Sequence, residues 1–316
     1  MFNCECFSID ISLQKSKPLI EKDKKTVFRF SPSRWWSMFS PSIMKADPFL
    51  FVHNDTLHLF YEEMPIGNGL GVLKKVSTKD LTHWSTPVQI THEPKTHFSY
   101  PWVFEHEGNI FMLPETGCDH NLRLYKAVND ELTEFESYKV ILERPKSLRD
   151  DIKFDYADSC IYIKEGIYYL FSSYYDGEQY FLELYTSDAL EGTYVLHPSS
   201  PICIGNKYGR CAGSLIENEG KLYRPTQDCM SVYGGQVHLM EIDELTPTKY
   251  REHVVQDNLL PTDMSLYKQG GHQLNFAEFM GKTVVATDYR YICQFTLERL
   301  RLKILKLLHL KENTPY

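Results

Sequence analysis

Three acidic residues, Asp47, Glu115 and Asp158, occupy related positions in a recurring sequence pattern. Carboxyl groups that share a cleft can carry out glycosyl transfer. One group stays protonated and donates to a leaving oxygen, while another stays ionised and activates a nucleophile or stabilises positive charge on the sugar. Neighbouring carboxylates raise one another's pKa and can separate into these two roles. The three residues are therefore candidate catalytic groups, and a turn cap or a surface charge is the alternative for each.

The pattern that relates these residues is a repeated hairpin. Its copies begin at Asp47, Tyr100, Asp158, Ala212 and Gln273. Each copy has an apolar run, a two-residue turn and a second apolar run, and Gly is the second turn residue in four of the five copies. Gly adopts the positive φ that short hairpin turns need. Most copies continue with a third apolar strand and a polar turn. This periodicity predicts an all-β, five-bladed β-propeller, and a β-sandwich or an irregular sheet protein is the alternative.

The repeat also divides the chain. We expect residues 1–40 to form an N-terminal extension that packs on the propeller or closes it, and residues 41–316 to form the propeller itself. The segment 300–313 could form a last strand pair or a terminal helix.

The hairpin geometry predicts where the polar residues gather. A two-residue turn pairs the first residue of each copy with the residue fifteen positions later, so both lie at the open end of the hairpin, and a slip of one residue would bring in their neighbours. The later positions hold Glu62, Glu115, Ser173, Gln227 and Asp288. One end of the ring should therefore collect carboxyl groups, and propellers bind ligands at such an end.

The fourth copy adds two arginines. Arg210 and Arg224 accompany Gln227 and Asp228. An arginine offers a planar fork that suits carboxylate or phosphate groups. We expect these four residues to bind substrate, with the arginines holding an anionic part of a phosphosugar or nucleotide sugar. The alternative is a structural clamp in which one arginine pairs with Asp228.

Three further residues complete the predicted substrate-binding set. His272 could contact a sugar hydroxyl or a metal, and Trp102, close to Tyr100, could stack on a sugar; packing in the core is the alternative for both. The histidines show no HExxH spacing, so we predict no zinc site, no other metal and no cofactor.

Composition excludes several partners. The 316 residues carry a formal charge of −8 and no long basic run, so nucleic acid is not expected. The eight cysteines show no CxxC pair, which favours reduced thiols and a cytoplasmic location. The first residues lack the features of a secretory signal, and no apolar run approaches the roughly 18 residues of a transmembrane segment. Association with a membrane surface stays open.

Two resemblances point to carbohydrates. "ADPFLFVHNDTLHLFYE" followed by "VSTKDLTHW" resembles the opening blade of the five-bladed propeller glycosidases of glycoside hydrolase families 43 and 32. In those families an Asp that opens the first blade is the base or nucleophile, which implies that role for Asp47. A second Asp orients and a Glu is the acid. The family order is Asp, Asp, Glu, whereas this chain has Asp47, Glu115 and Asp158, so the acid role does not transfer by position.

The second resemblance covers about residues 40–290. "YPWVFEHEGNIFMLPET", "LYRPTQDC" and "GGHQLNF" resemble the N-terminal domain of glucosamine inositolphosphorylceramide transferases and its bacterial relatives. It implies a glycosyltransferase-like enzyme of surface polysaccharide or glycolipid assembly, with a sugar donor and a glycan or lipid-linked acceptor as partners. In the eukaryotic proteins a separate glycosyltransferase domain follows the propeller. A glycoside hydrolase and a non-catalytic sugar-binding scaffold are therefore the alternatives.

Overall fold

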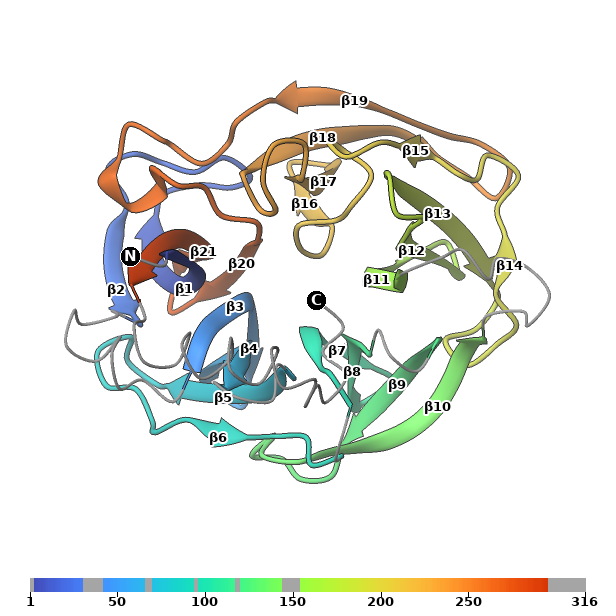
Figure 1. The fold of residues 1–316 in the computed structure, drawn as a ribbon. Helices are drawn as coiled ribbons and strands as arrows, with labels where there is room; N and C mark the ends of the chain where they lie inside the picture. The colour runs from blue at the N-terminus through green and yellow to red at the C-terminus, as the bar shows by residue number, and fades with distance from the viewer. Residues whose placement is uncertain are drawn as a thin grey trace, which may run out of the picture.

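The computed structural model describes residues 3–30, 42–65, 70–93, 96–116, 120–143 and 154–294, and these form an almost entirely β structure (Figure 1). The predicted strand pair or helix at 300–313 lies outside the described residues. Groups of strands surround a central axis, and the colours run once around the ring from the blue N-terminal strands to the red C-terminal ones. Among the described residues, no helix has the length and apolar character needed to cross a membrane.

The strands form four sheets. One sheet has eight strands in the order β20-β21-β1-β3-β4-β5-β6, with β2 beside β1; the others are β10-β9-β8-β7, β11-β12-β13-β14 with β15 beside β13, and β16-β17-β18-β19. In the eight-stranded sheet the strands are β1 (Asn3–Gln14), β2 (Lys25–Arg29), β3 (Ser42–His53), β4 (Thr56–Pro65), β5 (Val72–Thr78), β6 (Val88–Gln89), β20 (Leu274–Phe279) and β21 (Lys282–Gln294). In the second sheet they are β7 (Ser99–His106), β8 (Asn109–Glu115), β9 (Asn121–Ala127) and β10 (Phe135–Glu143). In the last two they are β11 (Phe154–Lys164), β12 (Ile167–Tyr175), β13 (Tyr180–Ser187), β14 (Val195–Leu196), β15 (Cys203–Ile204), β16 (Ile216–Asn218), β17 (Lys221–Asp228), β18 (Gln236–Leu245) and β19 (Tyr250–Gln256).

The eight-stranded sheet contains two units. Within the described residues, the strand pairing between its halves is one parallel pair, Phe7 of β1 opposite Met44 of β3. Divided there, it gives a first unit of β3 to β6 and a last unit of β20, β21, β1 and β2. Together with the other three sheets this makes five units. The N-terminal strand β1 runs antiparallel to β21 from Asn3 opposite Gln294 to Gln14 opposite Thr283.

The five predicted hairpins are all present. Each two-residue turn has positive φ at both positions, as the type I′ geometry that suits the twist of the flanking strands requires. The turns are Asn54-Asp55, Glu107-Gly108, Glu165-Gly166, Glu219-Gly220 and Met280-Gly281. The predicted all-β propeller fold is therefore confirmed.

The core lies between units rather than within one. Each of five buried apolar clusters joins strands of two consecutive units, and the fifth joins the last unit to the first. For example, Phe49 of β3 packs in the same cluster as Met112 of β8, and Ile9 of β1 in the same cluster as Leu59 of β4. Successive residues of a strand point to opposite faces of its sheet, and both faces carry apolar residues here. Each sheet therefore buries one face against the unit before it and the other against the unit after it.

The innermost strands of the first three units share a bulge. Asp47, Tyr100 and Asp158 all have φ near +50°, at 51°, 49° and 49°. The pairing register shifts at each of them, so Glu62 lies opposite Ala46 and not opposite Asp47. A bulge leaves one residue unpaired and redirects its side chain. The predicted pairing of the first residue of a copy with the residue fifteen positions later is thus displaced by one residue in these units.

Candidate active site

A cavity of about 540 Å³ opens where the innermost strands meet. Three carboxyl side chains line it: Asp47 in the bulge of β3, Glu62 on β4 and Glu115 at the end of β8. Arg210, which precedes β16, lines it too. The predicted carboxyl-rich end of the ring is therefore a real cavity in this structure.

The cavity also has an apolar and aromatic part. Its walls include side chains from the first, third, fourth and last units: Phe7, Met44, Met64, Tyr175, Tyr180 and Tyr233. Flat aromatic faces beside hydrogen-bonding groups suit a sugar ring, which has polar edges and apolar C–H faces.

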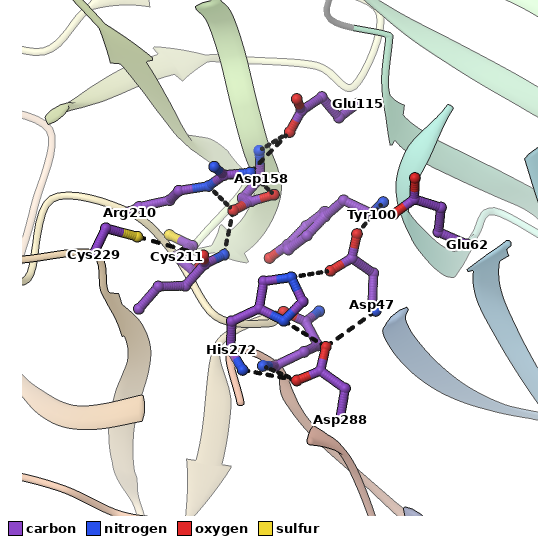
Figure 2. Close-up of polar contacts among 12 residues, drawn as sticks. Asp47, Glu62, Tyr100, Glu115, Asp158, Arg210, Cys211, Cys229, His272 and Asp288 are labelled. Atoms are coloured by element: carbon purple, nitrogen blue, oxygen red, sulfur yellow. Dashed lines mark hydrogen bonds and ion pairs between the residues drawn. The ribbon is translucent and has the colours of Figure 1, made fainter. Parts of the chain in front are cut away.

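Arg210 is held on several sides. Its Nε and Nη2 donate to Asp158, with Nη2 3.2 Å from Oδ1, and Nη2 also lies 3.5 Å from Glu115 Oε2 (Figure 2). Its Nη1 donates to Tyr180 Oη at 3.0 Å. The rings of Tyr180 and Tyr233 lie 5.4 Å and 5.3 Å from the guanidinium carbon, within cation–π range. Most of the guanidinium donors are thus already used within the protein.

Asp158 and Glu115 form the other half of this cluster. The backbone N–H of Asp158 donates to Glu115 Oε2 at 3.2 Å. Gln227 Nε2 donates to Asp158 and, at 2.8 Å, to the carbonyl of Cys211. Asp158 is 1% exposed, so its charge is compensated by Arg210 and by this amide rather than by water.

On the other side, Asp47 faces a buried histidine. Its Oδ2 accepts the backbone N–H of Tyr100 at 3.0 Å, and its Oδ1 lies 3.5 Å from His272 Nε2. His272 Nδ1 lies 2.5 Å from Asp288 Oδ2, and Asp288 Oδ1 accepts the backbone N–H groups of His272 and Gln273 at 2.7 Å and 3.0 Å. Figure 2 shows Asp288, His272 and Asp47 as a chain that leads to the cavity.

Burial sets the proton affinities in the cavity. It raises the pKa of Asp47 to about 6, against the opposing effect of His272, and that of Glu115 to about 8, against the opposing effect of Arg210. Burial beside the other carboxyl groups raises the pKa of Glu62 well above its usual value. Burial alone would lower the pKa of Arg210, but Asp158 beside it keeps that pKa well above its usual value. The carboxyl groups therefore differ in how readily they release a proton.

One group of residues has the atom types of a metal site. Ligand-type atoms of Asp47, His272 and Asp288 all lie within 4.8 Å of one another. The 2.5 Å between His272 Nδ1 and Asp288 Oδ2 is a hydrogen-bond distance. Two ligands that each sit about 2.0–2.6 Å from one ion are normally further apart than this. As arranged, the three residues therefore fit a chain of ion-pair contacts better than a metal centre, although neither ring nitrogen of His272 has hydrogen-bond geometry toward its carboxylate.

Of the seven predicted substrate-binding residues, Arg210 alone lines this cavity, and Arg224 and Asp228 have partners elsewhere. Arg224 on β17 is fully buried and pairs with Glu252, with Nε–Oε2 at 2.9 Å, while its Nη1 donates to the carbonyl of Tyr208 at 3.1 Å. This is a clamp, as in the structural alternative, but its partner is not Asp228. Asp228 lies 3.2 Å from His238 Nε2 instead.

The two predicted aromatic residues contribute backbone and packing. Tyr100 supplies the N–H that holds Asp47, and its buried ring packs on Phe49 with centroids 4.7 Å apart. Trp102 stacks on Phe104 at 4.3 Å and packs against apolar clusters between units. Neither ring lines the cavity.

Three residues that line the cavity are not among the site residues predicted from the sequence. Tyr175 and Tyr180 flank the turn between β12 and β13, and His97 precedes β7. None of them is the first residue of a hairpin copy or the residue fifteen positions later. Tyr175 lies two residues after such a position, so a search of the residues just beyond each hairpin would have found it.

The fold and this site together define a β-propeller whose axial cavity is lined by buried carboxyl groups. Residues 33–276 match the family model of "Glucosamine inositolphosphorylceramide transferase 1, N-terminal", so the chain belongs to that family.

Curated relatives carry the same description. The chain is 36% identical over 221 residues to glucosamine inositolphosphorylceramide transferase 1 of Arabidopsis thaliana, a match that covers 67% of this chain and 27% of that protein. It is 34% identical over 218 residues to the protein of the same name from Oryza sativa subsp. japonica, covering 67% of this chain and 28% of that protein. The match thus spans little more than a quarter of these relatives.

Solved structures with the same fold are glycosidases by name. An α-L-arabinofuranosidase from Podospora anserina in complex with cellotriose has a TM-score of 0.57 at 11% identity, covering 79% of this chain and 92% of that chain. A family 32 β-fructofuranosidase from Bombyx mori has a TM-score of 0.54 at 17% identity, covering 76% and 54%. At these identities the likeness shows the fold alone.

Proposed function

We propose that the cavity binds a sugar and cleaves or transfers a glycosidic bond by acid–base chemistry. The observation that carries this proposal is that Asp47 and Glu115, buried in one cavity, hold protons with different affinity. A glycosidic bond breaks when one group protonates the leaving oxygen while another, ionised, supports the attack on the anomeric carbon.

Each residue then has a defined part. Asp47 is the ionised base or nucleophile, the role that the glycosidase resemblance implies. Glu115 is the acid, because its pKa near 8 keeps it protonated at neutral pH. Arg210, 3.5 Å from it, stabilises the carboxylate left behind after the proton moves. Asp158 fixes the position of Arg210 through its ion pair.

The cavity residues suit a leaving group that departs as a neutral sugar hydroxyl better than one that departs as a phosphate. A departing phosphate needs cations that are free to bind it, and most donors of Arg210 are occupied, while Arg224 lies away from the cavity. Protonation by Glu115 neutralises a sugar leaving group without a cation. Glycosidase-type chemistry therefore fits the described cavity residues better than direct binding of a phosphosugar.

A glycosyltransferase with an activated donor is the second candidate. The observation in its favour is the family match, since the relatives are named as transferases. In this reading a glycan or lipid-linked acceptor enters the cavity beside the aromatic wall, and surface polysaccharide or glycolipid assembly in the cytoplasm is the proposed setting.

The test compares the two candidates directly. The purified protein is incubated with a panel of aryl glycosides and, separately, with a panel of nucleotide sugars and sugar phosphates. The proposal expects release of the phenol from at least one aryl glycoside, and loss of that activity in Asp47→Asn and Glu115→Gln. Asp228→Asn, outside the cavity, is the control that keeps it. Turnover only with a nucleotide sugar would favour the transferase, and binding that survives loss of both carboxyl groups would indicate a non-catalytic scaffold.

A further inference from the structure

Glu62 is a carboxyl group in the cavity to which the acid–base scheme gives no role. Its side chain is 2% exposed, and its Oε1 has no hydrogen-bond partner among the described residues. It nevertheless lines the cavity. Oε1 is buried against Gly71 and His97, so Glu62 reaches the cavity through its other carboxyl oxygen, Oε2. A buried carboxyl group with an oxygen that accepts no hydrogen bond is costly to ionise.

The chain makes room for this carboxyl group. Gly71 precedes β5, and a Cβ at this position would lie 2.2 Å from Glu62 Oε1 and 2.4 Å from the carbonyl oxygen of Phe98. Because the second contact is with backbone, no rotamer change could relieve it. Any residue other than glycine would therefore force both the Glu62 carboxyl group and the backbone at Phe98 to move.

His97 orients the same carboxyl group. Its Nδ1 accepts the backbone N–H of Gly71 at 2.8 Å, so the proton of the neutral ring is on Nε2. Burial and the positive charge of Arg210 lower the pKa of His97 to about 4, and the ring is neutral at neutral pH. Its Nε2–H faces Glu62 Oε1 across 3.8 Å. Gly71 and His97 thus fix Glu62 without giving it a cation.

The contrast with Glu115 separates the roles of the two carboxyl groups. Glu115 contacts Arg210 and accepts the N–H of Asp158, so both partners stabilise it once it has lost its proton. Figure 2 shows Glu62 on the opposite side of the site from Arg210, beyond Asp47. An anion at Glu62 would therefore lie in a low-dielectric wall beside a second carboxylate, and the described residues place no positive charge in contact with it.

We propose that Glu62 stays protonated throughout and donates a hydrogen bond to an oxygen of the bound sugar, with Gly71 and His97 as its positioning residues. This inference rests on the proposed sugar site and deepens it, because it assigns the residue that recognises a neutral oxygen acceptor. A carboxylic acid kept neutral in an apolar setting is an effective hydrogen-bond donor. Glu115 transfers its proton, whereas Glu62 keeps its own.

The protonation state can be tested without any substrate. The carboxyl-carbon NMR signals of the protein labelled at glutamate are followed between about pH 5 and pH 8. The signal that disappears in Glu62→Gln should keep the shift of the acid form over this range, and His97→Gln should move the position of that signal because the ring beside Oε1 is lost. The Glu63 signal, assigned with Glu63→Gln, is the control, since Glu63 pairs with Lys74 at 3.0 Å. A Glu62 signal that has the carboxylate shift at pH 7 would overturn the proposal.

The second test uses binding of neutral methyl glycosides, measured by calorimetry. Glu62→Gln keeps an N–H donor and should bind within about threefold of the original protein, while Glu62→Leu should bind at least about tenfold more weakly, the scale of one lost hydrogen bond to a buried partner. Glu63→Gln should bind normally. Equal losses in Gln and Leu, or no loss in Leu, would overturn the proposed contact. If the unaltered protein binds no methyl glycoside, the sugar site itself is wrong, and the NMR result still decides the protonation of Glu62.

Discussion

Two arginines in the same unit, Arg210 and Arg224, have opposite surroundings. Arg224 is fully buried and faces one carboxylate, Glu252, through two N–H groups, with Nη2–Oε1 at 2.5 Å, while its Nη1 donates to a backbone carbonyl. Arg210 is shared between Asp158 and Glu115 and lies at a cavity that also holds Asp47 and Glu62.

The difference lies in charge balance. A one-to-one pair with matched forks is neutral, closed and fixed in its protonation, so it holds strands together and does little else. A cluster with more carboxyl groups than cations cannot ionise fully, so some of its members keep protons at neutral pH. Perturbed proton affinities beside a cavity mark functional sites. The comparison suggests that excess carboxyl groups, and not the arginines, define the active region.

The largest effect should come from breaking the closed pair. Arg224→Met leaves Glu252 buried without its cation, and we expect a loss of about 3–5 kcal/mol in the free energy of unfolding. Arg210→Met should cost less, because Asp158 keeps the hydrogen bond from Gln227 and Glu115 can stay protonated. Denaturant unfolding at neutral pH measures both. Equal losses would show that the two clusters do not differ in this way.

Removing a carboxyl group at the cavity should have the reverse effect of Arg224→Met: activity is lost and stability is kept. Asp47→Asn and Glu115→Gln should each lower turnover by at least about 100-fold, the scale of a lost acid or base. Their stability at neutral pH should hold or rise, since burial disfavours these charges. Glu252→Gln is the matched control, with lower stability and normal turnover per folded molecule. Normal turnover in either cavity variant would remove that residue from the mechanism.

The pH dependence should distinguish the clusters further. Activity that needs ionised Asp47 and protonated Glu115 should be highest between pH values of about 6 and 8. The rising and falling limbs of the pH–rate profile belong to the coupled carboxyl groups together and not to single residues.

Stability follows the same shifts. Because the folded-state pKa of Glu115 is raised to about 8, the folded state binds more protons than the unfolded one, and its contribution to stability is lost as pH rises through that pKa. Glu115→Gln should flatten this loss, and Glu252→Gln should not. Thermal melts across this range would show it, and an unchanged slope in Glu115→Gln would contradict it.

The smallest effects should come from changes that keep the charge. Arg224→Lys loses the matched fork, so we expect a loss of roughly 1–2 kcal/mol in stability and no change in ligand affinity. Arg210→Lys should weaken ligand binding, because its hold on Asp158 and Glu115 shapes the cavity. Calorimetry with the ligand found in the panels measures this, and weaker binding in Arg224→Lys would restore Arg224 as a substrate contact.

The hairpins could be predicted from the sequence because a two-residue turn with Gly has few backbone solutions. The candidate residues that depended only on hairpin position, Asp47, Glu115 and Gln227, accordingly lie at or beside the cavity. Asp228, also a predicted substrate-binding residue, does not line the cavity, and the sequence contains the reason. It follows Gln227 directly in β17, and neighbouring strand residues point to opposite faces.

The bulges and the ion pairs could not be predicted from local sequence patterns in this way. The displacement at Asp47 depends on how β3 meets its neighbours, and Asp residues with positive φ also occur in many turns. Glu252 lies 28 residues after Arg224, and no local pattern announces that they meet. His97 acquires its orientation only through the backbone of Gly71, a contact across 26 residues.

The pairing of β1 with β21 has a consequence for how the chain folds. Residues at the two ends of the described chain are neighbours along the full length of β1, so their contacts have the largest sequence separation among the described residues. Closing so long a loop costs chain entropy before any contact repays it, which slows folding. Phe7 of that strand lines the cavity and packs on His272 at 4.4 Å. We therefore expect the site to assemble in the slowest step of folding, when the two ends of the chain join.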